Sequence, residues 1–310
     1  KLAVLELPSF YGDRDASKRQ SAKDVQNLLK QVRQEKADGL LLDLSRNGGG
    51  LLEYAVSISG FFVRQGGIVA VRQGKQEPKV LEDPDEGILF SGPMVVLTSR
   101  VTASASEILA GALKDYRRAL VVGDDQTFGK GTVQSVVPIR TGLGALKITT
   151  ALFFRPGGES TQKSGVRSDI VLPSLSNNEE FGEAAQPYAL PGQTIPAFLR
   201  GSDGGQPSVW QPVQPDVVTQ LATRSQDRVN QSKDFQDVEK QLEDARKNKG
   251  VVKLDEMLKQ REENGTHGKD PEDVAREEAK KPSVQQKEAL QILADYVVLE
   301  RDKLIAQGGS

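Results

Sequence analysis

Short apolar runs alternate with amphipathic stretches through the first 174 residues of the chain. Residues 21–35 carry four apolar side chains at helical spacing, beginning at Val25, and residues 51–62 and 104–116 are further predicted helices. Apolar runs of strand length lie at 2–7, 40–44, 68–72, 94–98, 119–123, 132–138 and 146–154. Strands that alternate with helices in this way predict an α/β fold.

The pattern changes beyond residue 174. Residues 175–215 are rich in Asn, Gly, Pro, Gln and Ser, which indicates a linker or a long loop. Residues 216–310 are charged, mixed in sign and helical in pattern, with two separate apolar faces. Neither face is long enough for a coiled coil. We therefore expect a small helical domain that packs on the α/β core of residues 1–174 and carries no catalytic group.

The composition of the chain argues against several kinds of binding partner. The 310 residues are 37% hydrophobic and 27% charged, with a net charge of -2, so neither nucleic acid nor a membrane surface is expected as a partner. No apolar run approaches the roughly 20 residues of a membrane span. There is no cysteine, which excludes disulfides and thiolate metal sites, and we expect neither a metal nor a cofactor. The chain begins with Lys1 in a strand-like run, so we expect that a preceding segment has been removed.

Two polar residues, Ser104 and Lys130, stand out because each closely follows an apolar run. Open α/β sheets place their chemistry where strands end. The chain has one histidine, His267, far along the sequence, and no cysteine. A cysteine nucleophile is therefore impossible, and a Ser-His-Asp triad would need that remote histidine. A serine with a lysine base is the best remaining route to nucleophilic catalysis.

Ser104 also has a purely structural interpretation. Residues 104–107 read Ser-Ala-Ser-Glu, which fits a capping box in which Ser104 caps a helix and Glu107 reaches back to it. Caps are far commoner than nucleophiles, yet the two roles can coexist. A serine at a helix start directs the N–H of Ala105 toward the oxygen of an attacked carbonyl, and one such donor is worth roughly 3 kcal/mol.

Lys130 taken alone is most simply a solvated surface charge. To act as a base it needs burial that lowers its pKa from the ordinary value of ~10.4. Apolar and glycine neighbours place no acid beside it, whereas Asp124 and Asp125 would oppose the shift if they pointed toward it. The five residues between Gly123 and Gly129 do not fit a phosphate-binding loop, which needs four.

The order of the motifs is more specific than any one of them. A glycine loop comes first, and the serine and lysine motifs follow. The loop either lets backbone amides approach a substrate closely or is a plain tight turn. The segments are LDLSRNGGG at 42–50, TASASE at 102–107 and FGKGTVQ at 128–134, supported by DYRRALVVG at 115–123, GGESTQ at 157–162 and GVRSDI at 165–170. In this order they strongly resemble the C-terminal processing peptidases, over residues 1 to about 174.

The resemblance implies a fold and a set of roles. The fold would be a crotonase-like (ClpP/crotonase) spiral of β-β-α units with an additional C-terminal helical domain. The activity would be that of a serine endopeptidase with Ser104 as nucleophile and Lys130 as general base. Gln134 would orient the lysine, and the backbone amides of Gly50 and Ala105 would form the oxyanion hole. Residues 1–174 would be the catalytic core, 175–215 a linker and 216–310 the helical domain.

The resemblance also implies partners and a location. Substrates would be proteins with exposed apolar C-termini, an adaptor protein would be a further partner, and the location would be the periplasm. The PDZ domain that precedes the core in this family and captures substrate C-termini is absent from the sequence, which fits a truncated chain. Two alternatives remain, a catalytically silent peptide-binding scaffold of the same fold and an acyl-CoA enzyme that shares it. The intact Ser104 and Lys130 favour the peptidase.

Overall fold

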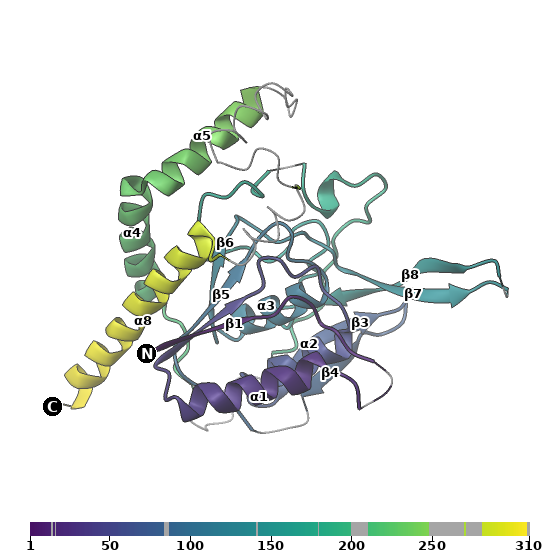
Figure 1. Cartoon of the computed structure of the whole chain (residues 1–310). Helices are drawn as coiled ribbons and strands as arrows, with labels where there is room; N and C mark the ends of the chain where they lie inside the picture. The colour runs from purple at the N-terminus through teal and green to yellow at the C-terminus, as the bar shows by residue number, and fades with distance from the viewer. Residues whose placement is uncertain are drawn as a thin grey trace.

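The computed structural model describes residues 1–13, 15, 17–83, 87–140, 142–178, 180–199, 210–247, 270 and 281–308. Two β-sheets form the frame of the molecule, and helices cover both faces of one of them (Figure 1). The predicted α/β class with a helical C-terminal part is confirmed. The histidine considered above, His267, lies outside the described residues.

A five-stranded parallel sheet forms the centre of the molecule. Its strands, in spatial order, are β1 (Leu2–Glu6), β2 (Gly39–Asp43), β5 (Met94–Thr98), β6 (Leu120–Gly123) and β9 (Ile170–Val171). Strands β5 and β6 are buried along their whole length, as expected for parallel strands that are covered on both faces. They are neighbours, with Thr98 opposite Gly123. The loops that carry Ser104 and Lys130 therefore leave the same edge of the sheet side by side.

Alternate residues of these strands face opposite sides of the sheet. The side that includes Leu40 and Val96 packs against α1 (Ser21–Gln34), α2 (Leu52–Gly60) and α3 (Ala105–Asp115). Apolar residues of these helices, such as Leu29, Ile58 and Leu109, are fully buried there. This core fixes the position of α3, and so of the serine at its start.

The C-terminal helices cover the other side of the sheet. The side that includes Leu41 and Val95 packs against α4 (Pro215–Gln231) and α8 (Val284–Gly308). Figure 1 shows these two helices beside the sheet. The guanidinium of Arg228 on α4 joins these helices through Glu288 at 2.8 Å and Asp295 at 2.7 Å, and α5 (Lys233–Lys247) extends beyond them. Among the helices of the described residues, none combines the length and the hydropathy that a membrane span requires.

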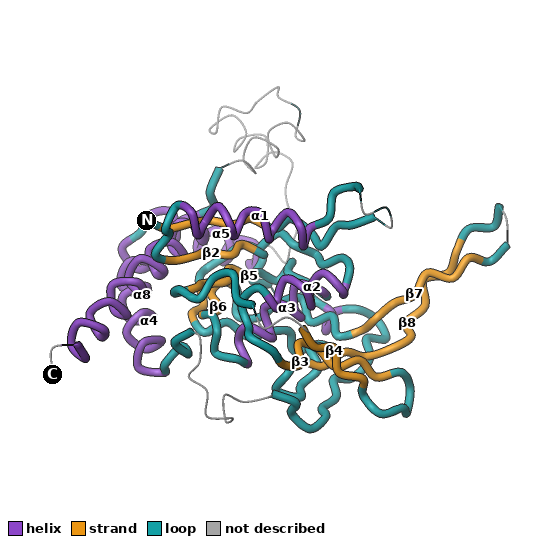
Figure 2. Tube along the Cα trace, turned by 90° about the horizontal axis from the view of Figure 1, so that it is seen from below, coloured by secondary structure: helices purple, strands orange, loops and turns teal. Residues whose placement is uncertain are grey.

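The second sheet is antiparallel and ends in a projecting hairpin (Figures 1 and 2). Its order is β4 (Lys79–Asp83), β3 (Gly66–Arg72), β8 (Ala145–Phe154) and β7 (Thr132–Pro138), so β7 is an edge strand. The hairpin of β7 and β8 exposes a set of large apolar side chains. They are Val136, Val137, Ile139, Leu143, Leu146 and Ile148.

Candidate active site

Ser104 precedes the first residue of α3 and has an unusual backbone conformation. Its φ of 59° and ψ of -116° contrast with the extended conformation that a capping residue ordinarily adopts. Such a conformation costs a residue with a side chain on the order of 1–3 kcal/mol and is concentrated at functional sites. The predicted capping box is confirmed, since the Glu107 carboxylate accepts the N–H of Ser104 at 2.8 Å. The structure thus gives this serine a cap position and a strained backbone together.

The glycine loop lies directly against Ser104. A Cβ on Gly49 would come within 2.9 Å of the Ser104 Cβ, so only glycine permits this approach. The buried Asn47 fixes the loop, because its side-chain oxygen accepts the N–H of Gly49 at 2.9 Å. The backbone oxygen of Asn47 accepts the N–H of Ala103 at 3.1 Å and the hydroxyl of Ser106 at 2.9 Å. The two loops are therefore hydrogen-bonded to each other on both sides of Ser104.

The two amides expected to form an oxyanion hole belong to these loops. Within the described part of the chain, neither the N–H of Gly50 nor that of Ala105 donates to a protein acceptor. Gly50 has a φ of 144°, and a Cβ there would come within 2.4 Å of the Phe10 oxygen. The bonds that pair this loop with Phe10 come from its neighbours, since the carbonyl of Gly49 accepts the N–H of Phe10 at 3.0 Å and the N–H of Leu51 donates to the carbonyl of Phe10 at 2.9 Å. Both donors remain available for a ligand oxygen.

Lys130 follows β6 in a loop that contacts the serine loop directly. The N–H of Phe128 donates to the carbonyl of Thr102 at 2.9 Å. The Lys130 ammonium donates to the side-chain oxygen of Gln134, on β7, at 3.2 Å. No carboxylate among the described residues forms an ion pair with it. Its partner in the structure is therefore a neutral amide, which does not hold the proton on the lysine as an acid would.

The electrostatic surroundings of Lys130 favour loss of its proton. Partial burial lowers the pKa of Lys130, and the positive charge of Lys147 lowers it further. The negative charges of Glu183 and Glu107 act in the opposite direction, and the burial effect is the larger. The direction of this shift is the one that a lysine base requires.

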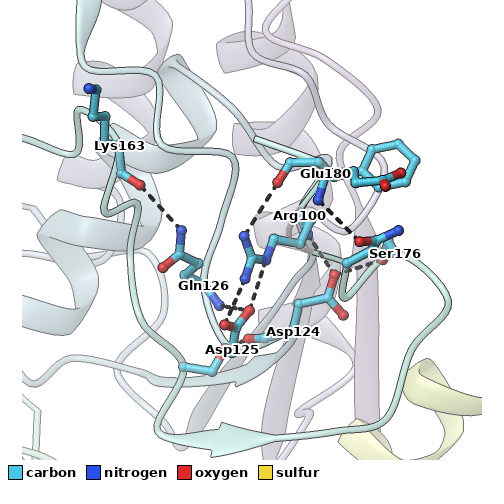
Figure 3. A network of polar contacts seen from close by, with 10 residues as sticks. Arg100, Asp124, Asp125, Gln126, Lys163, Ser176 and Glu180 are labelled. Atoms are coloured by element: carbon cyan, nitrogen blue, oxygen red, sulfur yellow. Dashed lines mark hydrogen bonds and ion pairs between the residues drawn. The ribbon is translucent and has the colours of Figure 1, made fainter. Parts of the chain in front are cut away.

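The two acids near Lys130 in the sequence are engaged elsewhere. Figure 3 shows Asp125 bound by the Arg100 guanidinium, at 2.8 and 2.7 Å. Asp124 accepts the backbone N–H of Arg100 at 2.7 Å and the hydroxyl of Ser176 at 2.6 Å. Neither is among the charges that act on the pKa of Lys130. In this arrangement, neither carboxylate opposes the lowering of the Lys130 pKa.

Glu107 is the centre of the site, and the sequence indicated only its capping role. Its carboxylate is fully buried and accepts four hydrogen bonds. The donors are the N–H groups of Ser104, Gly129 and Lys130, at 2.8, 2.7 and 2.9 Å, and the hydroxyl of Thr127 at 2.5 Å. Burial raises the pKa of Glu107 to about 7, and the four donors oppose that rise. One carboxylate therefore holds the serine backbone and the lysine loop together.

The sequence signal for this role would have been an acidic residue on a helix whose other residues are apolar or small enough to be buried. Residues 105–113 are all buried, and Glu107 is the acid among them. A second contact that the sequence did not indicate involves Gln162, which is 1% exposed and accepts the N–H of Gly131 at 2.9 Å. Both contacts join residues more than 20 positions apart, and no local pattern encodes them. Within the described residues, no group of three or more His, Cys, Asp or Glu side chains could hold a metal ion.

Replacing Glu107 with glutamine should separate the two loops. The amide NH2 would face N–H donors that now share one carboxylate, so the buried donors lose acceptors at a cost of about 1–3 kcal/mol each. We expect a lower melting temperature and, for the peptidase reaction that the motifs lead us to expect, a rate about a hundredfold lower, since small misplacements of reacting groups have effects of that size. Rate and melting temperature are measured on the same samples.

The matched control is Glu53→Gln, which removes an exposed acid from the first turn of α2. It should change neither the rate nor the melting temperature.

The pKa of Glu107 in the folded protein lies above its ordinary value of 4.5, so the folded state binds the extra proton. Its proton-linked contribution to stability is therefore full below pH 4.5 and is lost as pH rises toward about 7. The difference in unfolding free energy between wild type and Glu107→Gln should follow that direction, and the opposite slope would contradict the assignment.

Comparison with known proteins agrees with the motif order. Residues 1–172 match peptidase family S41, and residues 176–298 match the C-terminal domain of tail specific protease (DUF3340). The tail-specific protease of Haemophilus influenzae is 39% identical over 203 residues, which cover 63% of this chain and 28% of that protein. The carboxy-terminal-processing protease of Bartonella bacilliformis is 40% identical over 172 residues, which cover 55% of this chain and 38% of that protein.

Among solved structures, the photosystem II D1 C-terminal processing protease aligns with a TM-score of 0.49 and 33% identity. That alignment covers 58% of this chain and 45% of the other. The chain spans less than half the length of each of these relatives. The resemblance predicted from the motifs is confirmed over the first 172 of the 310 residues. The chain belongs to peptidase family S41.

Proposed function

We propose that the chain carries the catalytic machinery of a serine endopeptidase that uses a Ser104–Lys130 dyad and acts on proteins with exposed apolar C-termini. The convergence of both loops on Glu107 is the observation that carries the proposal. A single buried carboxylate oxygen accepts the N–H of Ser104 and the N–H of Lys130, at 2.8 and 2.9 Å. A plain helix cap has no need of this connection, nor of a backbone held in the conformation of Ser104.

The proposed reaction begins with neutral Lys130. Its amine accepts the proton of the Ser104 hydroxyl while the oxygen attacks the peptide carbonyl carbon, which gives a tetrahedral intermediate. The lysine ammonium then gives its proton to the leaving amine as the C–N bond breaks, and an acyl ester remains on Ser104. Lys130 then takes a proton from a water molecule, whose oxygen attacks the ester carbonyl. The bond to the Ser104 oxygen breaks, and the lysine ammonium returns the proton to that oxygen, which regenerates the serine and the neutral amine. The side-chain oxygen of Gln134 accepts a hydrogen bond from the Lys130 nitrogen and would hold that nitrogen in place during the reaction.

The developing oxyanion would be bound by the N–H groups of Gly50 and Ala105. Both belong to loops that meet at Ser104, and both remain without a protein acceptor within the described residues. Fixed backbone donors are effective because they need no reorganisation when the charge develops. The hydrogen bonds of Asn47 that join the two loops would supply that rigidity.

The preference for apolar, unfolded substrates is supported by the projecting hairpin. Its strand β7 carries Gln134, lies at the edge of its sheet and exposes Val136 and Val137 farther along. An edge strand offers backbone groups that an extended polypeptide can pair with, and apolar side chains beside it favour an apolar sequence.

Several finer parts of the proposal rest on the resemblance. We infer the crotonase-like spiral of β-β-α units, which the helices that follow parallel strands support. We also infer a division into a core at 1–174, a linker at 175–215 and a helical domain at 216–310. The two family matches, which end at residue 172 and begin at residue 176, support the first boundary. The periplasmic location and the adaptor protein stay predictions.

The test compares two unfolded substrates that differ only in their last residues, one apolar and one acidic. The full chain should cleave the apolar-ended substrate faster, and mass spectrometry should find internal cleavage sites. No cleavage of either substrate, with folding verified by circular dichroism, would contradict the proposed activity. Equal rates would contradict the terminal preference alone.

A variant of the hairpin tests the role of its apolar surface. Val136→Ser should raise the KM for the apolar substrate several-fold, because burial of a valine is worth about 1.5 kcal/mol or more. The kcat should stay unchanged. The control is Val171→Ser on β9, which is 50% exposed and lies on the other sheet. A KM that rises equally in both variants would exclude a specific role for the hairpin.

A further inference from the structure

A segment of the C-terminal family match lies against the lysine loop. The match begins at residue 176. Close to that start, the hydroxyl of Ser176 donates to Asp124 at 2.6 Å (Figure 3). The Arg100 guanidinium donates to the carbonyl of Phe181 at 3.3 Å. Two residues farther, the N–H of Glu183 donates to the carbonyl of Phe128 at 2.8 Å. This segment is therefore bound to the loops that lead to Ser104 and to Lys130.

Gln162 connects Glu183 to the residue after the lysine. Its side-chain oxygen accepts the N–H of Gly131 at 2.9 Å. Its side-chain nitrogen donates to the Glu183 carboxylate at 2.9 Å and to the carbonyl of Leu190 at 3.1 Å. The amide is 1% exposed, and both of its donor hydrogens and its acceptor are in use. Glu183 thus fixes the orientation of the amide, because a reversed amide would set its NH2 against the N–H of Gly131.

The charge of Glu183 acts on the lysine as well. Three charged groups influence the pKa of Lys130 besides burial. Lys147, on β8, lowers it, while Glu183 and the buried Glu107 raise it. Of the two acids, Glu183 can be substituted without breaking the hydrogen bonds that Glu107 accepts from the backbones of Ser104 and Lys130.

We propose that Glu183 and Gln162 are positioning residues for the lysine base, because Glu183 is bound to the carbonyl of Phe128, two residues before Lys130, and through Gln162 to the N–H of Gly131. The inference rests on the proposed role of Lys130 as general base. The hydrogen bond from Gln162 to Glu183 holds the backbone after Lys130, and the negative charge of Glu183 keeps the lysine protonated to a higher pH than burial alone would.

The test is the pH dependence of kcat for the full chain and two variants. Glu183→Gln keeps an oxygen that accepts the Gln162 hydrogen bond but removes the charge. Its rate at high pH should stay close to wild type, and the acidic limb of the profile should move to lower pH. Glu183→Ala removes both, so the limb should move in the same direction and the high-pH rate should also fall about tenfold, the effect of losing one buried hydrogen bond.

Two further variants make the sign of the effect decisive. Lys147→Gln removes a positive charge that acts on Lys130, so its acidic limb should move to higher pH, opposite to Glu183→Gln. Glu180→Gln removes an exposed acid three residues from Glu183 and should leave the limb where it is. An unchanged limb in Glu183→Gln, or equal shifts in Glu183→Gln and Glu180→Gln, would overturn the electrostatic statement. A high-pH rate that Glu183→Ala leaves unchanged would overturn the positioning statement.

A second readout does not depend on peptidase activity. Acetic anhydride reacts only with the neutral amine, so the rate at which Lys130 is acetylated across a pH series, measured by peptide mass spectrometry, titrates this side chain directly. Glu183→Gln should move its titration to lower pH and Lys147→Gln to higher pH. If the chain cleaves no substrate but the titration shifts as stated, the proposed function fails and the electrostatic coupling stands. If the chain is active and the titration does not move, the coupling is wrong.

Discussion

Replacing Ser104 with alanine should abolish proteolysis and leave the fold intact. The variant lacks the only hydroxyl that the proposed mechanism uses, so its rate should fall to that of a blank. Loss of a helix cap costs about 0.5–2 kcal/mol, and the melting temperature should fall by the corresponding few degrees. The measurements are the cleavage rate of an unfolded substrate and the melting temperature of the same preparation.

A second serine variant separates chemistry from stability. Ser57→Ala removes an exposed hydroxyl that is bonded to a carbonyl within its own helix α2, and it should leave the rate unchanged. If Ser104 were a cap and nothing more, Ser104→Ala would keep its activity below the melting transition. A turnover within tenfold of wild type would refute the nucleophile assignment.

Lys130→Arg should be as inactive as Lys130→Ala. The guanidinium keeps the positive charge and can still donate to Gln134, but it stays protonated and cannot accept a proton. General base catalysis contributes roughly 10²–10⁴-fold, and the nucleophile is not activated without it, so we expect a loss at or above that range. Wild-type activity should rise with pH as Lys130 loses its proton, at a pH below that of an ordinary lysine, because burial lowers its pKa.

The alternative role of Lys130 as a fixed positive charge makes the opposite prediction. In that case arginine would substitute in part, and activity would not rise with pH over the titration of Lys130. Residual cleavage by Lys130→Arg that exceeds that of Lys130→Ala by more than tenfold would favour the charge over the base.

The sequence predicted the parallel sheet well because its strands are continuous apolar runs. Strands β2, β5 and β6 lie within one residue of the ranges predicted from those runs. Strand β4, which reads KVLED, was missed because it is short, mixed in polarity and only partly buried, so it has neither an apolar run nor clear alternation. The pairing of β3 with β8, and hence the second sheet, joins segments about 80 residues apart and has no local signal.

The candidate site was predictable to the extent that catalysis depends on residue type. Ser104 and Lys130 were identified by elimination and by the strands they follow, and the order of the motifs predicted the family. Glu107 was predicted only as a cap, because its contacts with Gly129 and Lys130 depend on β5 and β6 being neighbours. The contact of Gln162 with Glu183 likewise depends on a segment that reads as a polar linker.

Active-site labelling tests the dyad most directly. A fluorophosphonate forms a phosphorus–oxygen bond with an activated serine and releases fluoride, and peptide mass spectrometry identifies the residue that carries the phosphonate. We predict a single labelled site, Ser104, a labelling rate that rises with pH, and a rate at least about a hundredfold lower in Lys130→Arg. A label on another residue, or equal labelling of Ser104 in wild type and Lys130→Arg, would contradict a Ser104–Lys130 dyad.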